Sequence, residues 1–269
     1  MDELVKKGLS TAGSNVLVKL PAPTLVAGMT GDQQRIAIEK INRGDDPTRL
    51  LKKSVAGPFI LEIESVGELP DNGKLQQVDL WFVAHGKLSN IENRQLFEEL
   101  AKPNAKNKNG PPECVRELTP DEFKERGLTA GSLDDGSKVS YGVLQSNVLD
   151  KAYLTGMTFS QGDRSVDTVT MAFRLEPKLK DDKAFPTRWY SLKKDDDGNL
   201  ASVEPSTYSI ACAYAKATKL LGEEEAIFVE VHLVFAEPFG WFEGRNLLRS
   251  KLPLLLQDAV RTFRRKLAE

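Results

Sequence analysis

The chain has 269 residues, 40% of them hydrophobic and 28% charged, a composition that is ordinary for a globular protein and sufficient to bury a core without disulfide bonds. Its 37 Lys and Arg residues nearly balance its 39 Asp and Glu residues, which argues against a nucleic-acid binder, because such proteins carry a basic excess or a basic stripe. No stretch has the apolar length that spans a bilayer, and the N-terminus MDELVKKGLS lacks the apolar region of a signal peptide; a cytoplasmic location is therefore expected by default, with export as the alternative if a signal peptide has been removed.

The first 30 residues are predicted to form an arm, and residues 31–269 a single α+β domain. Pro21 and Pro23 interrupt the apolar runs of the arm. Thr30 and Gln33 then form a capping-box pattern, in which each side chain bonds the backbone N–H of the other residue. This pattern predicts a helix over residues 31–43, followed by a glycine that ends it in a left-handed conformation.

Two segments alternate between apolar and polar residues, which is the pattern of half-buried strands. Residues 59–66 (FILEIESV) are the first and residues 77–85 (QVDLWFVAH) the second. The turn sequence PDNG lies between them, so we predict a β-hairpin.

A capping-box pattern at Ser89 and Glu92 predicts a second helix. Its buried side would carry Leu96, Phe97 and Leu100. The stretch from Lys102 to Leu118 has few apolar residues and is predicted to be an exposed loop within the domain. A third capping box, at Thr119 and Glu122, predicts a short helix with proline at its first position.

Strands are predicted in succession from residue 138 onward. The first four cover residues 139–149, 152–159, 167–175 and 188–192. Residues 207–219 fit either a strand or an alanine-rich helix. We favour the strand, because it would pair with residues 227–235, which alternate in full and follow across the connection LGEEEA.

The last predicted element is an amphipathic helix. Ser250 is a suitable N-cap, and Pro253 falls within the first turn. Apolar residues recur along one side at helical spacing: these are Leu252, Leu255, Leu256, Ala259, Val260, Phe263 and Leu267. A stripe this wide must be buried, and the preceding sheet is the obvious place.

The only dense basic cluster of the chain lies near the end of this helix. It consists of Arg261, Arg264, Arg265 and Lys266. Arg264 lies off the apolar stripe, and the cations are expected to complement the carbonyl end of the helix. Contact with an anionic surface is the alternative.

Successive strands, the break Glu237-Pro238-Phe239-Gly240-Trp241 and one long C-terminal helix together resemble the helix-grip architecture of START-like lipid-transfer domains. The resemblance lies in residues 226–267. It implies a curved antiparallel sheet around the last helix, with an apolar cavity between them, and it implies no common catalytic residue. The candidate cavity residues are Phe235, Trp241, Leu256, Val260 and Phe263. The alternative for each of them is that it fills a core.

Histidine is scarce, which limits the catalytic arrangements that depend on a histidine side chain. A Ser-His-acid triad would need His85 or His232, the two histidines of the chain. His232 shares a strand face with Glu230, so a Glu/His pair is geometrically possible. The simpler interpretation is a polar cross-strand position on the less buried face of a sheet. His85 precedes Gly86 and is typical of a strand entering a turn. No catalytic residue is assigned.

Neither metals nor disulfide bonds are predicted. The sequence DDDGN, residues 195–199, has the composition of a calcium loop, but the first ligand position would be Lys193, a cation where a carboxylate is required. A hairpin turn is the better interpretation. Cys114 and Cys212 form neither a metal knuckle nor a disulfide framework. Two free buried thiols are expected, with a single bridge as the alternative in an exported protein.

We therefore expect non-enzymatic binding of an apolar small molecule or lipid between sheet and helix, with no cofactor, no nucleic-acid partner and no transmembrane segment. The alternative is a structural or protein-interaction module, such as one of the cell envelope, without a small-molecule ligand. A third hypothesis is an enzyme that uses Glu230 with His232.

Overall fold

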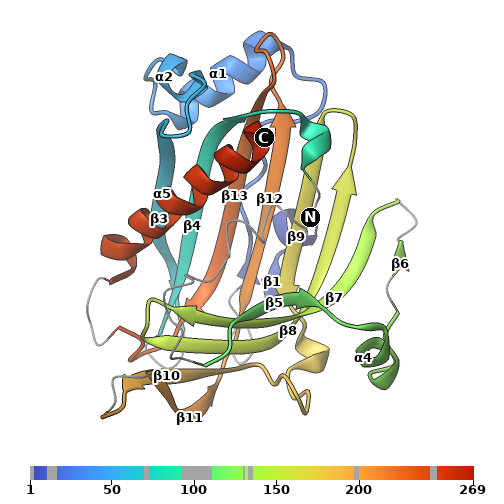
Figure 1. Ribbon diagram of the computed structural model, residues 1–269, viewed down its shortest axis with the longest axis vertical. Helices are drawn as coiled ribbons and strands as arrows, with labels where there is room; N and C mark the ends of the chain where they lie inside the picture. Colours follow the sequence, from blue (N-terminus) through green and yellow to red (C-terminus); the bar gives the residue numbers. More distant parts are fainter. Residues whose placement is uncertain are drawn as a thin grey trace.

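A computed structural model of the chain describes residues 3–10, 17–69, 73–91, 111–129, 131–132, 136–196, 200–242 and 247–269. In these residues nearly all strands belong to one large antiparallel sheet, and a long C-terminal helix, α5 (Leu247–Ala268), crosses one face of it (Figure 1). The predicted α+β class, an antiparallel sheet packed on a long C-terminal helix, is confirmed.

The large sheet has 11 strands in the described residues, with the order β11-β10-β8-β9-β12-β13-β4-β3; β7 pairs with β8, and β5 and β6 pair with β7. The strands of the sheet are β3 (Phe59–Glu68), β4 (Lys74–His85), β5 (Cys114–Glu117), β6 (Gly131–Ser132), β7 (Lys138–Val148), β8 (Ala152–Arg164), β9 (Thr168–Leu175), β10 (Arg188–Lys194), β11 (Leu200–Thr207), β12 (Ala211–Lys219) and β13 (Ala226–Glu237). The short strands β1 (Leu9–Ser10) and β2 (Leu17–Val18) pair separately, after a π-helical turn at Glu3–Lys7.

The predicted strands agree with the structure, and so does the choice of a strand for the alanine-rich segment. That segment is β12, which pairs with β13 in a register that sets Ala215 opposite Val231. Strand β11 was not predicted. It pairs with β10 across the predicted turn at residues 195–199, and it shows no alternation because Ala201 to Thr207 are exposed on both sides.

Two of the predicted capping boxes are confirmed. Thr30 and Gln33 cap α1 (Gly31–Ile41), and Thr119 and Glu122 cap α4 (Pro120–Glu125), with both reciprocal hydrogen bonds present in each box. A further short helix, α2 (Thr48–Leu51), follows α1. The helix predicted after Ser89 falls on residues outside the described part. Leu88–Asn90 forms a 3₁₀ turn, η2, and a second such turn covers Pro177–Leu179.

Two predictions about element boundaries are wrong. Ser250 does not cap α5, because the helix is already formed at Leu247; the Ser250 hydroxyl instead donates a hydrogen bond to the Leu247 carbonyl (3.2 Å). The loop predicted for Lys102 to Leu118 ends in strand β5, whose backbone pairs with β7. Leu118 is buried. Strand pairing at a sheet edge needs backbone groups rather than an apolar pattern, so composition missed it. Residues 102–110 lie outside the described part.

The central strands separate two cores, because successive side chains point to opposite faces of a sheet. We call the side that α5 covers the helix face, and the opposite side the outer face. The helix face includes Leu80, Phe82, Ile227 and Val229, which pack with Val260, Phe263 and Leu267 of α5. The outer-face core includes Leu25, Ile38, Leu50, Trp81, Val83 and Phe228. Figure 1 shows α5 in front of β3 and β4 and the N-terminal residues behind the sheet.

Candidate functional site

Helix α5 is fixed to the helix face by its C-terminal half. Val260, Phe263 and Leu267 are buried, and the ring of Phe263 meets that of Phe82 edge to face at 5.5 Å. The stripe residues nearer the N-terminus, such as Leu252 and Leu256, remain partly exposed. The predicted apolar stripe therefore docks on the sheet as expected, most tightly at its C-terminal end.

Arg264 anchors this half of the helix, although the sequence placed it off the stripe. It is 3% exposed, and its guanidinium donates to the carbonyls of Val83 (2.8 Å), Gly57 (2.5 Å) and Pro58 (2.7 Å). Burial lowers the pKa of Arg264 to about 10. The expectation that it complements its own helix end is wrong, because these acceptors belong to β4 and to the segment before β3.

The five predicted cavity residues lie in two packed groups. Phe235 and Trp241 belong to one core, in which their rings stack at 6.3 Å and Trp241 also stacks on Tyr208 at 5.7 Å. Val260 and Phe263 belong to the core under α5. Leu256 packs against both groups. All five residues are therefore packed against other side chains, and Leu256 marks where the two groups meet.

Large apolar side chains on the helix face remain partly exposed beside α5. They are Met171 and Phe173 of β9 and Val231 and Leu233 of β13; together we call them the β9–β13 patch. Strand β12 lies between β9 and β13, and its residues beside the patch are alanines. Ala215 pairs with both Val231 and Met171, and Ala213 pairs with both Leu233 and Phe173. The patch is thus two ridges of larger side chains separated by a strand of small ones.

The outer face of β4, β12 and β13 holds a cluster of charged residues, which we call the His232 cluster: Asp79, Lys216, Glu230 and His232. Their exposed fractions are 6%, 7%, 0% and 1%. His232 Nδ1 lies 2.6 Å from Asp79 Oδ1, and His232 Nε2 lies 3.4 Å from Glu230 Oε2. The interpretation of Glu230 and His232 as residues on a less buried face is wrong, because a distant segment covers them.

The covering segment consists of residues 17–30, which we call the N-terminal segment. The Thr24 N–H donates to Glu230 Oε2 (2.8 Å), and the Lys216 amine donates to the Leu25 carbonyl. The Tyr214 hydroxyl donates to the Pro21 carbonyl (2.9 Å), and the Trp81 indole N–H to Thr24 Oγ1 (3.1 Å). Side chains of the sheet therefore bind three backbone groups and one side chain of this segment.

Burial and nearby charge shift the pKa values of the cluster in opposite directions. Burial lowers the pKa of Lys216, which the negative charge of Glu230 opposes. Burial would also lower the pKa of His232, but hydrogen bonds to Asp79 and Glu230 outweigh it, so the His232 pKa is raised. Burial raises the pKa of the Tyr214 hydroxyl. The site therefore favours an imidazolium between two carboxylates.

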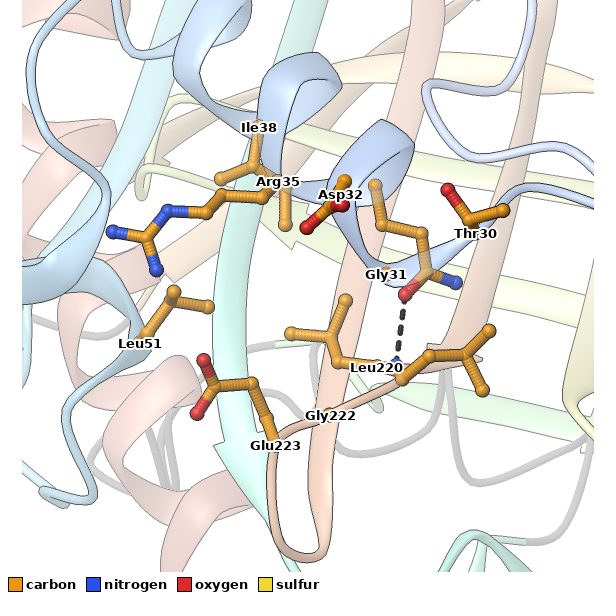
Figure 2. A pocket seen from close by; sticks show the side chains of 11 residues that line it. Thr30, Gly31, Asp32, Arg35, Ile38, Leu51, Leu220, Gly222 and Glu223 are labelled. Carbon is orange, nitrogen blue, oxygen red and sulfur yellow. Dashed lines mark hydrogen bonds between the residues drawn. The ribbon is translucent and has the colours of Figure 1, made fainter.

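A pocket of about 420 Å³ lies elsewhere, between α1 and the loop that joins β12 to β13 (Figure 2). Its lining mixes charges and apolar groups, including Asp32, Arg35, Ile38, Leu220 and Glu223, and contains none of the five predicted cavity residues. A hydrogen bond from the Leu221 N–H to Gln34 Oε1 (2.8 Å) joins two residues of its lining. It is a surface pocket with a mixed lining, separate from the predicted cavity.

Other chemical groups are sparse in the described part of the chain. It holds no group of three or more His, Cys, Asp or Glu side chains arranged to bind a metal, and none of its helices combines the length and apolar character needed to cross a membrane. Cys114 and Cys212 are both free. Cys212 is buried as predicted, and burial raises the pKa of its thiol to about 12, whereas Cys114 is only partly buried.

Sequence reasoning missed Asp79, Lys216 and Arg264. A signal for the first two exists, since each is a charged residue in the middle of an apolar strand, in QVDLWFVAH and AYAKATK. Charged residues in such positions are seldom buried unless they are paired. Arg264 carries no comparable signal, because an arginine near the end of an amphipathic helix is ordinary.

No protein-family model matches the sequence, and no curated protein matches it either. Among solved structures, the chain resembles human STARD10 (10% identity, 88% of this chain and 84% of that one, TM-score 0.32). It also resembles the lipid transfer and protein localization domain of human StarD13 (DLC2) (10% identity, 89% and 98%, TM-score 0.38). A third structure is an uncharacterized protein from Rhizobium leguminosarum (12% identity, 72% and 98%, TM-score 0.28).

Proposed function

We propose that the chain binds an apolar small molecule or lipid on the helix face, against the β9–β13 patch and the exposed edge of α5. One observation supports this most strongly. Met171, Phe173, Val231 and Leu233 lie on inner strands of the sheet, yet they keep part of their apolar surface exposed. Apolar surface gains about 25 cal/mol for each Å² removed from water, so an apolar ligand placed there would bind favourably.

The residues around the patch suit such a ligand. The small side chains of Ala213 and Ala215 leave space on the middle strand between the two ridges. Leu256 of α5 adds an apolar wall where the group around Trp241 meets the core under α5. Phe235, Trp241, Val260 and Phe263 then act mainly as the packed frame that fixes the patch. Small-molecule sites are usually lined mostly by apolar side chains.

The proposal is tested with the neutral fluorescent probe 1-N-phenylnaphthylamine, and native mass spectrometry gives the stoichiometry. Val231→Glu places a charge in the patch and should weaken probe binding more than tenfold, because the ligand would have to desolvate a carboxylate. Val203→Glu is the matched control, since Val203 is 41% exposed on β11, far along the strand order. Wild-type protein that binds no probe, or equal binding by both variants, contradicts the proposal.

The alternative, a protein-interaction module, is favoured by strand β11. Within the described part of the chain it lies at an edge of the sheet, and its residues from Ala201 to Thr207 are exposed. Unpaired edge strands accept a strand from another chain. A partner or second copy cross-linked to β11, together with no probe binding on the helix face, would support this function instead.

A further inference from the structure

We propose that the His232 cluster is a pH-dependent docking site for the N-terminal segment, holding residues 21–25 on the outer face and releasing them as the pH rises. This inference is independent of the proposed ligand on the helix face. It concerns the four sheet residues that bind the segment, namely Trp81, Tyr214, Lys216 and Glu230.

Two protons on His232 satisfy both of its contacts with carboxylates. Each ring nitrogen faces a carboxylate, Nδ1 that of Asp79 and Nε2 that of Glu230. A neutral imidazole has one N–H and can donate to only one of them. Loss of the second proton leaves a nitrogen lone pair facing a carboxylate and an uncompensated negative charge in a site with almost no solvent contact.

Glu230 connects this proton to the segment. Its Oε2 faces His232 and also accepts from the Thr24 N–H (2.8 Å), while its Oε1 has no hydrogen-bond partner among the described residues. A carboxylate that loses its imidazolium partner gains by turning toward water. Turning would break its bond to Thr24 and would require the segment to lift, because Leu25 is 0% exposed in the docked state.

The other groups that face His232 do not replace its charge. Asp79 and Trp81 face it from β4, and Tyr214 and Lys216 lie on the paired β12. Gln77 donates to Asp79 Oδ2 (2.6 Å) and is neutral. Lys216 directs its amine to the Leu25 carbonyl, and burial lowers its pKa. Residues 21–25 contain no titratable side chain.

The sign of the pH effect follows from proton linkage. The docked state binds the His232 proton more tightly than the open state, in which the pKa returns toward the ordinary value of about 6.5. Docking is therefore strongest below the open-state pKa. The opening equilibrium constant should rise about tenfold per pH unit between the open-state and docked-state pKa values, and it should level off above the latter.

Amide hydrogen exchange of the full-length protein measures this opening. A peptic peptide that covers residues 20–26 reports the segment, and one that covers residues 226–235 of β13 serves as the internal reference. After correction for the intrinsic pH dependence of exchange, protection of the first peptide should fall about tenfold per pH unit, while the reference stays protected. Unchanged protection of residues 20–26 from pH 5.5 to 9 overturns the proposal.

Variants separate the cluster from general effects of pH. His232→Gln should remove the pH dependence, whereas His85→Gln, at the only other histidine, should leave it intact. If His232→Gln does not fold, Glu230→Gln replaces it. Loss of one flanking carboxylate should move the midpoint down by about one pH unit. A transition that persists in His232→Gln, keeps its midpoint in Glu230→Gln, disappears in His85→Gln, or coincides with unfolding of the reference peptide contradicts a docking site at His232.

Discussion

The two faces of the central strands are covered in different ways. On the helix face, α5 covers Phe82 and Val229 with an apolar stripe that follows directly in the chain, and one arginine anchors it. On the outer face, a segment about 200 residues away in sequence covers Glu230 and His232 through bonds from sheet side chains to its backbone. Adjacent residues of one strand thus make apolar contacts on one face and charged hydrogen bonds on the other. We therefore expect the helix face to respond most to loss of packed side chains and the outer face to changes of charge and pH.

The largest expected effect is on the helix face, from Phe263→Ala. Phe263 is 4% exposed and packs on Phe82, so its removal should cost about 3–5 kcal/mol of unfolding free energy. Leu254→Ala is the matched control on the same helix, because Leu254 is 65% exposed, and it should change stability by less than about 0.5 kcal/mol. Urea unfolding measures both, and equal small costs would mean that α5 does not close this face.

Arg264→Ala should cost about 3 kcal/mol, because it leaves several buried carbonyls without their charged donor. Arg264→Lys should recover little of this, since an ammonium cannot reproduce the fork that reaches Val83, Gly57 and Pro58. Arg261→Ala, three residues earlier, should cost little, because its side chain is 41% exposed and lies 3.9 Å from Asp258. Urea midpoints of the three variants provide the measurement. Similar midpoints for Arg264→Ala and Arg261→Ala would show that Arg264 is no anchor.

Gly86→Ala tests how closely the end of α5 approaches the sheet. A Cβ at Gly86 would lie 2.3 Å from the Leu267 carbonyl oxygen, and the backbone has a positive φ of 155°. The substitution should cost about 2 kcal/mol through this clash and strain. Gly44→Ala separates the two causes, because Gly44 also has a positive φ but nothing within 4 Å; it should cost about 1 kcal/mol. Thermal unfolding of both variants measures the difference between the two stability costs. Equal costs would show that the Leu267 carbonyl does not lie against Gly86.

Glu230→Gln should have the smallest effect, and it should depend on pH. The amide keeps an acceptor for the Thr24 N–H but removes one charge that stabilises the His232 imidazolium, at a cost of about 1–2 kcal/mol below pH 6. The cost should shrink as the pH rises through the raised pKa of His232, because wild-type protein then loses the same stabilisation. Glu64→Gln on the exposed part of β3 is the control. Urea unfolding at pH 5.5 and pH 9 provides the comparison, and a cost independent of pH would contradict the imidazolium.

The helix face was largely predictable from sequence because its information is local. The alternation of residues 227–235 and the helical spacing of Leu256, Val260 and Phe263 predicted a sheet packed against α5, and both features are present. The predicted start of α5 was wrong. Ser250 and Pro253 are residue types that favour a helix start, but the actual boundary depends on the packing of residues such as Leu248.

The outer face was not predictable for the opposite reason. Glu230 and His232 look like surface positions in their own strand, and only a distant segment with no amphipathic pattern buries them. The composition of strand β13 alone cannot indicate that the N-terminal segment buries these two residues. The β9–β13 patch was likewise missed, because the partial exposure of Met171 and Val231 depends on where α5 stops covering the sheet.

The central claim is that the β9–β13 patch binds an apolar ligand, and a methionine methyl NMR titration tests it most directly. The chain has 4 methionines; Met171 lies in the patch, whereas Met157 is 0% exposed in a separate core beside Leu118 and Val143. Addition of 1-N-phenylnaphthylamine should shift the Met171 methyl signal in a saturable way and leave that of Met157 in place. A Met171 signal that does not move, or shifts of equal size at both methionines, would contradict the claim.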